Sequence, residues 1–298
     1  MNRRFGRYVV TISHPDKLLV GTHTKSGLIA YYDRISSSLI PYLKNHPLMM
    51  HRFPEGLTGE SFYQKDMPAY FPEWIERVTI PKKDGSYTAV VCQQKATLIY
   101  LVNQGCITPH LWLSRMDKLS IPDRLIFDLD PSDEDFNKVR LIALALKKLL
   151  DALGLESFVM TSGSRGLHIY VPLTRSAPFE VTKEFAHSCA QKIILEHPEN
   201  ATIEIRKEKR EGKVFIDYLR NQQGATAVAP YCVRAYTNAP IATPLYWYEV
   251  EDAQLHPQKY TLETIFTRQE TLHDPWKQFF TAGQTLTAAH KKLRTILT

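Results

Sequence analysis

The sequence has 298 residues, of which 44% are hydrophobic and 23% charged, so a folded globular protein is expected and a disordered chain is excluded. Lysine and arginine number 37 against 31 acidic residues, which gives a formal net charge of +6 and a pI near 9.0. A basic protein favours polyanionic partners, but many basic proteins bind no nucleic acid, so charge alone does not decide between these alternatives.

The cysteines and the N-terminus exclude several other classes of protein. Cys92, Cys106, Cys189 and Cys232 contain no CxxC pair, which argues against a structural zinc site, and their spacing indicates no disulfide framework. The apolar run at residues 8–12 is too short for a signal peptide or a membrane span. A cytoplasmic protein is therefore expected.

Residues 1–122 predict a first segment of mixed structure. Ser26 is expected to cap a helix whose apolar residues share one stripe. The stripe contains Leu28, Tyr31, Tyr32, Ile35, Leu39 and Leu43. Residues 51–70 are rich in proline, glycine and aromatics and are expected to form a loop. Residues 88–91 and 97–101 are expected to form short strands.

A strand followed by a long helix is predicted next. Residues 125–130 are apolar apart from their acids and indicate a strand. Ser132 or Asp133 is then expected to start a helix, and Gly154 follows it in the position that favours glycine. Apolar residues at helical spacing support this helix. They are Val139, Ile142, Leu146, Leu149, Leu150 and Leu153.

Two further strands, at residues 157–161 and 167–171, flank a tight glycine-containing turn. Thr182 is expected to cap a helix that runs through Ile194.

Residues 202–206 and 214–219 are then expected to pair as a hairpin around a charged loop, and the tail at 251–298 to be partly helical. This order predicts an α/β (α+β) fold with a mixed or antiparallel central sheet flanked by helices.

Three aspartates are the candidate catalytic residues. Asp128 and Asp130 lie two apart on a predicted strand and therefore share a face, where two like charges require a cation such as Mg²⁺ or Mn²⁺. For this spacing alone, solvated acids at a strand end are the commoner explanation. Asp217 lies in another apolar run, and its convergence with the first pair would form a site for two metals. The alternative is an ion pair with a nearby arginine.

The turn at residues 162–168 is a candidate phosphate cradle. Its glycines allow close backbone approach, and its serines, Arg165 and His168 are donors for phosphate oxygens. It is not a Walker A motif, and an ordinary glycine-rich hairpin is the alternative. Arg234 is a further candidate to bind phosphate as a fixed cation.

Taken together, these segments resemble the polymerase domain of bacterial ATP-dependent DNA ligase D, in the archaeo-eukaryotic primase superfamily. The matching segments occur in the family's order over about residues 10–250. They are residues 15–17 with Lys25, 52–56, 61–65, 109–112, 124–131, 161–172 and 214–234.

The resemblance implies a role for each matching residue. Asp128, Asp130 and Asp217 would be the ligands of two divalent metal ions, Mn²⁺ or Mg²⁺. The residues that would contact the incoming nucleotide are Ser162, Ser164, Arg165 and His168, with His110 at the ribose and Arg234 at the phosphates. Without the resemblance, His110 would be read as a loop histidine.

The DNA contacts implied by the resemblance lie mostly in the first segment. Lys17 and Lys25 would bind the 5′-phosphate at a gap or break, and Phe62 and Tyr63 would stack on template bases. Arg210 would be the functional arginine of a mobile loop. The plain alternatives are solvated lysines, core packing of the aromatics and a solvated hairpin tip.

Four positions depart from the family pattern. His14 precedes the Pro-Asp-Lys triplet where asparagine is frequent, and Arg165 stands where many members have lysine. Arg220 occupies a position where relatives can have glutamine, and Ala225 one that can be basic. These changes affect template or nucleotide contacts and leave the carboxylates intact.

The resemblance implies one primase-polymerase catalytic domain over residues 1–298, with an N-terminal lobe to about 120, a catalytic core at 121–250 and a helical tail. It implies addition of nucleotides, preferentially ribonucleotides, to 3′ ends at 5′-phosphorylated breaks in non-homologous end joining. A DNA ligase and a Ku-type protein are expected in trans, at the nucleoid. The alternatives are a de novo primase, a catalytically silent DNA-end-binding module and a metal-dependent phosphodiesterase.

Overall fold

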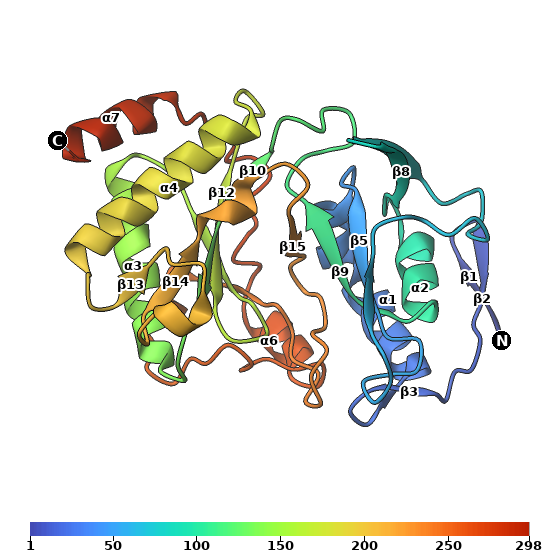
Figure 1. Ribbon diagram of the computed structural model, residues 1–298. Coiled ribbons are helices and arrows are strands. Elements are labelled where there is room, and N and C mark those ends of the chain that lie inside the picture. The colour runs from blue at the N-terminus through green and yellow to red at the C-terminus, as the bar shows by residue number, and fades with distance from the viewer. Residues whose placement is uncertain (298) are drawn as a thin grey trace. The chain divides into compact units, whose positions relative to one another are not determined.

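The computed structural model of the protein describes residues 1–297, and two units can be distinguished within it. Unit 1 contains Met1–Asp117, Thr226–Ala242 and Tyr260–Ile265. Unit 2 contains Lys118–Ala225, Thr243–Lys259 and the chain from Phe266 onward. The chain therefore passes between the units several times, and each unit has its own sheet and helices (Figure 1).

Unit 1 is built on an antiparallel sheet with the strand order β15-β9-β5-β6. Its strands are β5 (Leu48–Arg52), β6 (Phe62–Gln64), β9 (Cys106–Trp112) and β15 (Thr226–Val228). The register places His51 opposite Tyr63 and Met49 opposite His110. The expected loop at 51–70 is therefore partly wrong, because residues 62–64 pair along the edge of this sheet.

Helices α1 (Lys25–Leu43) and α2 (Lys95–Asn103) complete the core of unit 1. The prediction that Ser26 caps α1 is wrong. Thr24 is the cap, and its side chain accepts a hydrogen bond from the Gly27 amide at 3.1 Å. The strand predicted at 97–101 is also wrong, since these residues lie inside α2. Almost all of α2 is buried, so its short apolar run carried no helical periodicity to identify it.

Three short antiparallel pairs complete the strands of unit 1. They are β1 (Asn2–Phe5) with β2 (Tyr8–Thr11), β3 (Leu18–Val20) with β4 (His23–Thr24), and β7 (Arg77–Lys82) with β8 (Gly85–Val90). The predicted strand at residues 88–91 is confirmed by β8.

Unit 2 contains a mixed sheet with the strand order β13-β14-β10-β12-β11-β16. The strands are β10 (Arg124–Asp130), β11 (Phe158–Thr161), β12 (Leu167–Pro172), β13 (Ala201–Thr202), β14 (Val214–Asp217) and β16 (Pro244–Leu245). All neighbours are antiparallel except β13 and β14, so the mixed sheet flanked by helices confirms the predicted fold class.

The hairpin predicted from residues 202–206 and 214–219 is wrong. Strand β13 runs parallel to β14, which requires a longer connection than a tight turn. The 3₁₀ helix η1 (Lys207–Lys209) lies in that connection, and a second 3₁₀ helix, η2 (Tyr218–Asn221), follows β14 directly. The charged connection between β13 and β14 has no alternation of apolar and polar residues, so the sequence pattern could not predict how these two strands pair.

The long helices of unit 2 are α3 (Phe136–Ala152) and α4 (Phe179–Glu196). The cap of α3 is Asp135 rather than Ser132 or Asp133, and Gly154 follows the helix with a φ of 78° as expected. Helix α4 begins at Phe179 with Pro178 as its cap, so the cap predicted at Thr182 is wrong. Thr182 lies in the first turn, where its hydroxyl donates to the Pro178 carbonyl at 3.2 Å.

The tail contains α5 (Trp247–Glu251), α6 (Ile265–Thr271) and α7 (Thr287–Leu297), so it is partly helical as predicted. None of the helices in the described part of the chain is long and apolar enough to cross a membrane.

Alternation along β10 gives the unit 2 sheet two different faces. Phe127 and Leu129 point to one face, and helices α3 and α4 lie together on one side of β10 and β12 (Figure 1). The other face carries Asp128 and Asp130 and, toward the opposite end of the sheet, Tyr170. The C-terminal segment covers that far end with an aromatic cluster.

We expect Trp276→Ala to destabilise unit 2 by about 3–5 kcal/mol, because it removes the largest buried ring of this cluster. Trp276 is 1% exposed, contacts Phe158, Tyr170 and Phe279, and its indole donates a hydrogen bond to the Val159 carbonyl at 3.0 Å. Urea unfolding followed by far-ultraviolet circular dichroism measures the effect. Tyr248→Ala, at a 59% exposed ring, is the control, and an equal loss in both variants would contradict the prediction.

Candidate active site

The sheet of unit 2 brings the three predicted carboxylates to one face. Asp128 and Asp130 lie two residues apart on β10, so their side chains project to the same side. Strand β14 pairs with β10 so that Asp217 lies directly opposite Asp128. Side chains that are directly opposite in an antiparallel pair share a face, so residues about 90 positions apart meet by register alone.

Burial and neighbouring charges set the protonation of these acids. Burial raises the pKa of Asp130, and the adjacent Asp128 charge raises it further. Burial also raises the pKa of Asp217, an effect that the Arg220 charge opposes. Asp128 is 6% exposed, yet its pKa is lowered, because the charges and hydrogen bonds of His168 and Arg220 outweigh the cost of its burial. Asp128 is therefore the most strongly ionised of the three.

The guanidinium of Arg220 bridges two of the carboxylates. Its Nε lies 2.9 Å from Oδ2 of Asp128 and 3.1 Å from Oδ2 of Asp217. The ion pair that the sequence left open as an alternative for Asp217 is thus present. Sequence reasoning noted Arg220 only as a departure from the family, and its place three residues after Asp217 was the one available signal.

The donor set suits a hard divalent cation. All three acids offer carboxylate oxygens, which Mg²⁺ and Mn²⁺ prefer, and the Arg220 guanidinium shows that this pair of carboxylates attracts a cation. Within the described residues, no three His, Cys, Asp or Glu side chains are grouped so that they could hold a metal ion. Metal binding would therefore require contacts between these carboxylates and their present partners to be broken.

His168 lies beside the carboxylates on β12. It is opposite Asp128 in the strand register, and its Nε2 is 3.2 Å from Oδ1 of that residue. The ring is buried, and Nδ1 has no hydrogen-bond partner among the described residues. A buried ring nitrogen without a partner is unusual and is a candidate ligand contact.

The turn between β11 and β12 is ordered by its own first serine. The Ser162 hydroxyl accepts hydrogen bonds from the amides of Ser164, at 3.1 Å, and Gly166, at 3.0 Å. Gly163 has a φ of 64°, in the left-handed region that favours glycine. A Cβ at Gly166 would lie 1.8 Å from the Leu129 carbonyl oxygen, so only glycine lets this turn rest on β10 beside the carboxylates.

The two arginines predicted near this site differ in environment. The Arg165 side chain is 49% exposed and lies 4.0 Å from Asp130, so it is available to a ligand. Arg210 is 8% exposed, donates to the Glu204 and Ile205 carbonyls at 2.8 Å each, and lies over the Phe215 ring. Arg210 is therefore not a solvated hairpin tip, because its charge stabilises its own loop.

Unit 1 contains the residues that the resemblance assigns to the DNA end. Lys25 is 5% exposed and donates to the Ser13 hydroxyl at 3.4 Å, and burial and the Lys17 charge lower its pKa. Lys17 donates to the Pro54 carbonyl at 3.1 Å and to the Glu55 carboxylate at 2.8 Å. The two ammonium groups therefore belong to one cluster, with Glu55 as its counter-ion.

The aromatic residues of unit 1 lie on the sheet edge formed by β6. Phe62 and Tyr63 are 45% and 57% exposed, so they are not core residues. The Tyr63 ring stacks on His51 at 4.1 Å and meets the edge of His110 at 5.7 Å. Burial, and then the Arg234 charge, lower the pKa of His51 to about 4. His51, which sequence reasoning missed, thus links Tyr63, His110 and Arg234.

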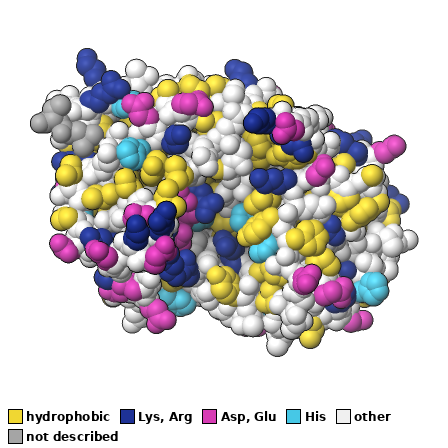
Figure 2. All heavy atoms as spheres, viewed as in Figure 1, with side chains coloured by type: hydrophobic (Ala, Val, Ile, Leu, Met, Phe, Trp, Pro, Cys, Tyr) yellow, Lys and Arg dark blue, Asp and Glu magenta, His cyan; other side chains and the backbone are white. Residues whose placement is uncertain are grey.

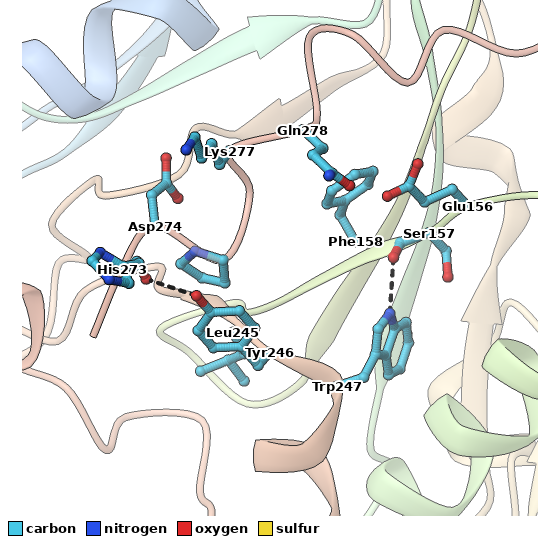
Figure 3. A pocket seen from close by; sticks show the side chains of 11 residues that line it. Glu156, Ser157, Phe158, Leu245, Tyr246, Trp247, His273, Asp274, Lys277 and Gln278 are labelled. Carbon is cyan, nitrogen blue, oxygen red and sulfur yellow. Dashed lines mark hydrogen bonds between the residues drawn. The ribbon is translucent and has the colours of Figure 1, made fainter. Parts of the chain in front are cut away.

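A separate cavity of about 700 Å³ in unit 2 contains none of the predicted site residues. Its lining includes Tyr246, Trp247 and His273 (Figure 3). The Trp247 indole donates to the Ser157 carbonyl at 2.8 Å, and the Tyr246 hydroxyl donates to the His273 carbonyl at 3.2 Å. These donors already serve the fold of unit 2, so the cavity has no part in the candidate site.

Comparison with known proteins identifies the family. Residues 24–276 match the family described as LigD, primase-polymerase domain. The bifunctional non-homologous end joining protein LigD of Bacillus subtilis is 34% identical over 259 residues, which are 86% of this chain and 41% of that protein. The multifunctional LigD of Mycolicibacterium smegmatis is 31% identical over 252 residues, 83% of this chain and 33% of that protein.

The chain thus spans a minor part of the length of these relatives. Its structure is similar to the polymerase domain of Mycobacterium tuberculosis ligase D in complex with DNA, with a TM-score of 0.86, 27% identity, and coverage of 92% of this chain and 99% of that one. The chain belongs to the LigD primase-polymerase domain family, whose members are nucleotidyltransferases.

Proposed function

We propose that this chain extends DNA 3′ ends with nucleotides, ribonucleotides in preference, at gaps and breaks that carry a 5′-phosphate. The observation that carries this proposal is the register of β10 and β14, which places Asp217 opposite Asp128 on the face that also holds Asp130. The solved M. tuberculosis relative, which is described in complex with DNA, supports DNA as the partner. On the face shown in Figure 2, basic side chains are interspersed with acidic ones, so net charge alone does not mark the DNA surface.

In the proposed reaction, the 3′-hydroxyl oxygen bonds to the α-phosphorus while the bond from that phosphorus to the oxygen bridging it to the β-phosphorus breaks. Pyrophosphate leaves with the electron pair of the broken bond, and the hydroxyl proton passes to water. Asp128, Asp130 and Asp217 would hold two divalent cations, Mn²⁺ or Mg²⁺. When bound, these ions supply charge neutralisation and activate the hydroxyl. Arg165 and His168 would donate to phosphate oxygens, and most of the rate enhancement would come from positioning.

His168 suits this role because of its present geometry. Nε2 faces the ionised Asp128, which favours a proton on that nitrogen, while Nδ1 is buried and without a partner among the described residues. A phosphate oxygen bound at Nδ1 would give this nitrogen the hydrogen-bond partner that it lacks among the described residues. In unit 1, His110 and Arg234 are the residues that we assign to the ribose and the phosphates of the nucleotide.

We assign the DNA end to the other residues of unit 1. Lys17 and Lys25 place two ammonium groups in one cluster, which suits a dianionic phosphate. The exposed rings of Phe62 and Tyr63 are suited to stack on template bases without reading their sequence. A DNA ligase and a Ku-type end-binding protein would act with this domain at the cytoplasmic nucleoid.

Replacing Asp128 by asparagine should lower primer extension by about 100-fold or more, because the variant keeps the shape of the side chain but loses the charge that a cation needs. Extension of a primer at a 5′-phosphorylated gap with Mn²⁺ and ATP measures the rate, and fluorescence anisotropy measures DNA binding, which we expect to be unchanged. Asp133→Asn is the matched control, since Asp133 pairs with Lys138 outside the site. Normal extension by the Asp128 variant would refute the metal assignment.

Lys17→Ala should reduce the preference for 5′-phosphorylated over 5′-hydroxyl gaps by about tenfold, because one charge-assisted contact to the phosphate is lost. Lys17 is chosen over Lys25 because Lys25 is buried and its loss would also disturb packing. The measurement is the ratio of anisotropy binding constants for the two gapped duplexes. Lys83→Ala, in the exposed β7–β8 turn, controls for net charge, and an unchanged ratio for Lys17→Ala would remove the end-recognition role.

A further inference from the structure

Two of the three carboxylates of the proposed metal site, Asp128 and Asp217, already have a protein donor at each oxygen. Oδ1 of Asp128 faces His168 at 3.2 Å, and Oδ2 faces Arg220 at 2.9 Å. Oδ1 of Asp217 accepts the Leu219 amide at 3.0 Å, and Oδ2 faces Arg220 at 3.1 Å. The guanidinium therefore holds one oxygen of each of two carboxylates that we propose as metal ligands.

A guanidinium and a divalent cation that both lie at these oxygens repel each other. Mg²⁺ and similar ions approach carboxylate oxygens to about 2.1 Å, and the planar, permanently charged guanidinium would then be both a steric and an electrostatic obstacle. Without any cation, however, two buried acids directly opposite each other repel. Arg220 relieves that repulsion at the cost of blocking the ligands.

The Arg220 side chain can move away from the two carboxylates without disturbing the structure around it. Its side chain is 41% exposed, whereas Asn221, the next residue, is fully buried. The Asn221 side chain accepts from the Ile126 amide at 2.8 Å and donates to the Ile126 carbonyl at 2.7 Å. These two hydrogen bonds anchor η2 to β10, so the guanidinium can swing into solvent without displacing the backbone.

We propose that Arg220 is a resident counter-cation that competes with the catalytic metal and lowers the affinity of the site for it. This inference rests on the proposed function, because it takes Asp128 and Asp217 as metal ligands. With no metal present, Arg220 offsets part of the negative charge of the two carboxylates. Metal binding then exchanges one cation for another, and the site fills only at a correspondingly higher metal concentration.

Binding of Mn²⁺ alone to the full chain, stripped with a chelator and free of nucleotide and DNA, tests this inference. Titration calorimetry or the electron paramagnetic resonance signal of free Mn²⁺ gives the dissociation constant. We expect Arg220→Gln and Arg220→Met to bind Mn²⁺ about tenfold more tightly or better, the gain expected when a charge-assisted contact no longer has to be broken. Arg220→Lys keeps the positive charge and should remain closer to the native affinity.

Thermal unfolding provides an independent measurement. In chelator, both neutral variants should melt below the native protein, since the carboxylates then lack a counter-charge. Saturating Mn²⁺ should raise the melting temperature of these variants more than that of the native chain. Using two neutral variants keeps the test valid if one of them fails to fold.

Asp217→Asn separates the two ways in which the test can fail. If Asp217→Asn binds Mn²⁺ as well as the native chain, the metal site itself is misassigned. If that variant loses binding while the neutral Arg220 variants bind Mn²⁺ no more tightly than the native protein, the metal site stands and the competitor role of Arg220 is overturned. Tighter binding by the neutral variants together with loss in Asp217→Asn supports both.

Discussion

The antiparallel register of β10 and β14 places two buried acids face to face, and the candidate site depends on this pairing. A slip of one residue would turn Asp217 toward the apolar side of the sheet, away from Asp128. Strand β14 has only four residues, so its own hydrogen bonds hold this register weakly. The Asn221 side chain supplies the rest, because it binds both backbone groups of Ile126 on β10 and is itself fully buried.

The strands and helices that were predicted best from the sequence are those with a clear pattern of apolar residues within their own segment. Strands β10, β11 and β12 are continuous apolar runs bounded by turn residues, and α3 has a clear amphipathic stripe, so periodicity was sufficient. The segment at 97–101 lacks such a stripe because α2 is buried on nearly all sides. The parallel pairing of β13 with β14 could not be predicted, since it depends on a charged connection that leaves no pattern in the sequence.

For the candidate site, sequence supplied the residue types and the structure supplied their partners. The spacing of Asp128 and Asp130 fixed a common face, the apolar run around Asp217 singled out the third acid, and the family resemblance predicted that the three converge. None of these could show that Arg220 bridges two carboxylates or that His168 turns Nε2 toward Asp128, because side-chain direction depends on which strands are neighbours. Arg210 shows the opposite failure, since a charged loop favoured an exposed arginine and the structure buries it over Phe215.

Both units balance a buried charge with a side chain that is itself partly exposed. In unit 2, two acids are held by Arg220, whose side chain is 41% exposed. In unit 1, the buried Lys25 and its neighbour Lys17 are accompanied by Glu55, which is 72% exposed. Under the proposed function, the metal would replace Arg220 as the counter-ion of the acids, and the 5′-phosphate would replace Glu55 as the counter-ion of the lysines. The binding free energy of the metal or the phosphate is then the difference between its own ion pairs and those of the protein counter-ion that it displaces. The exposed counter-ion therefore affects the affinity as much as the buried ligands do.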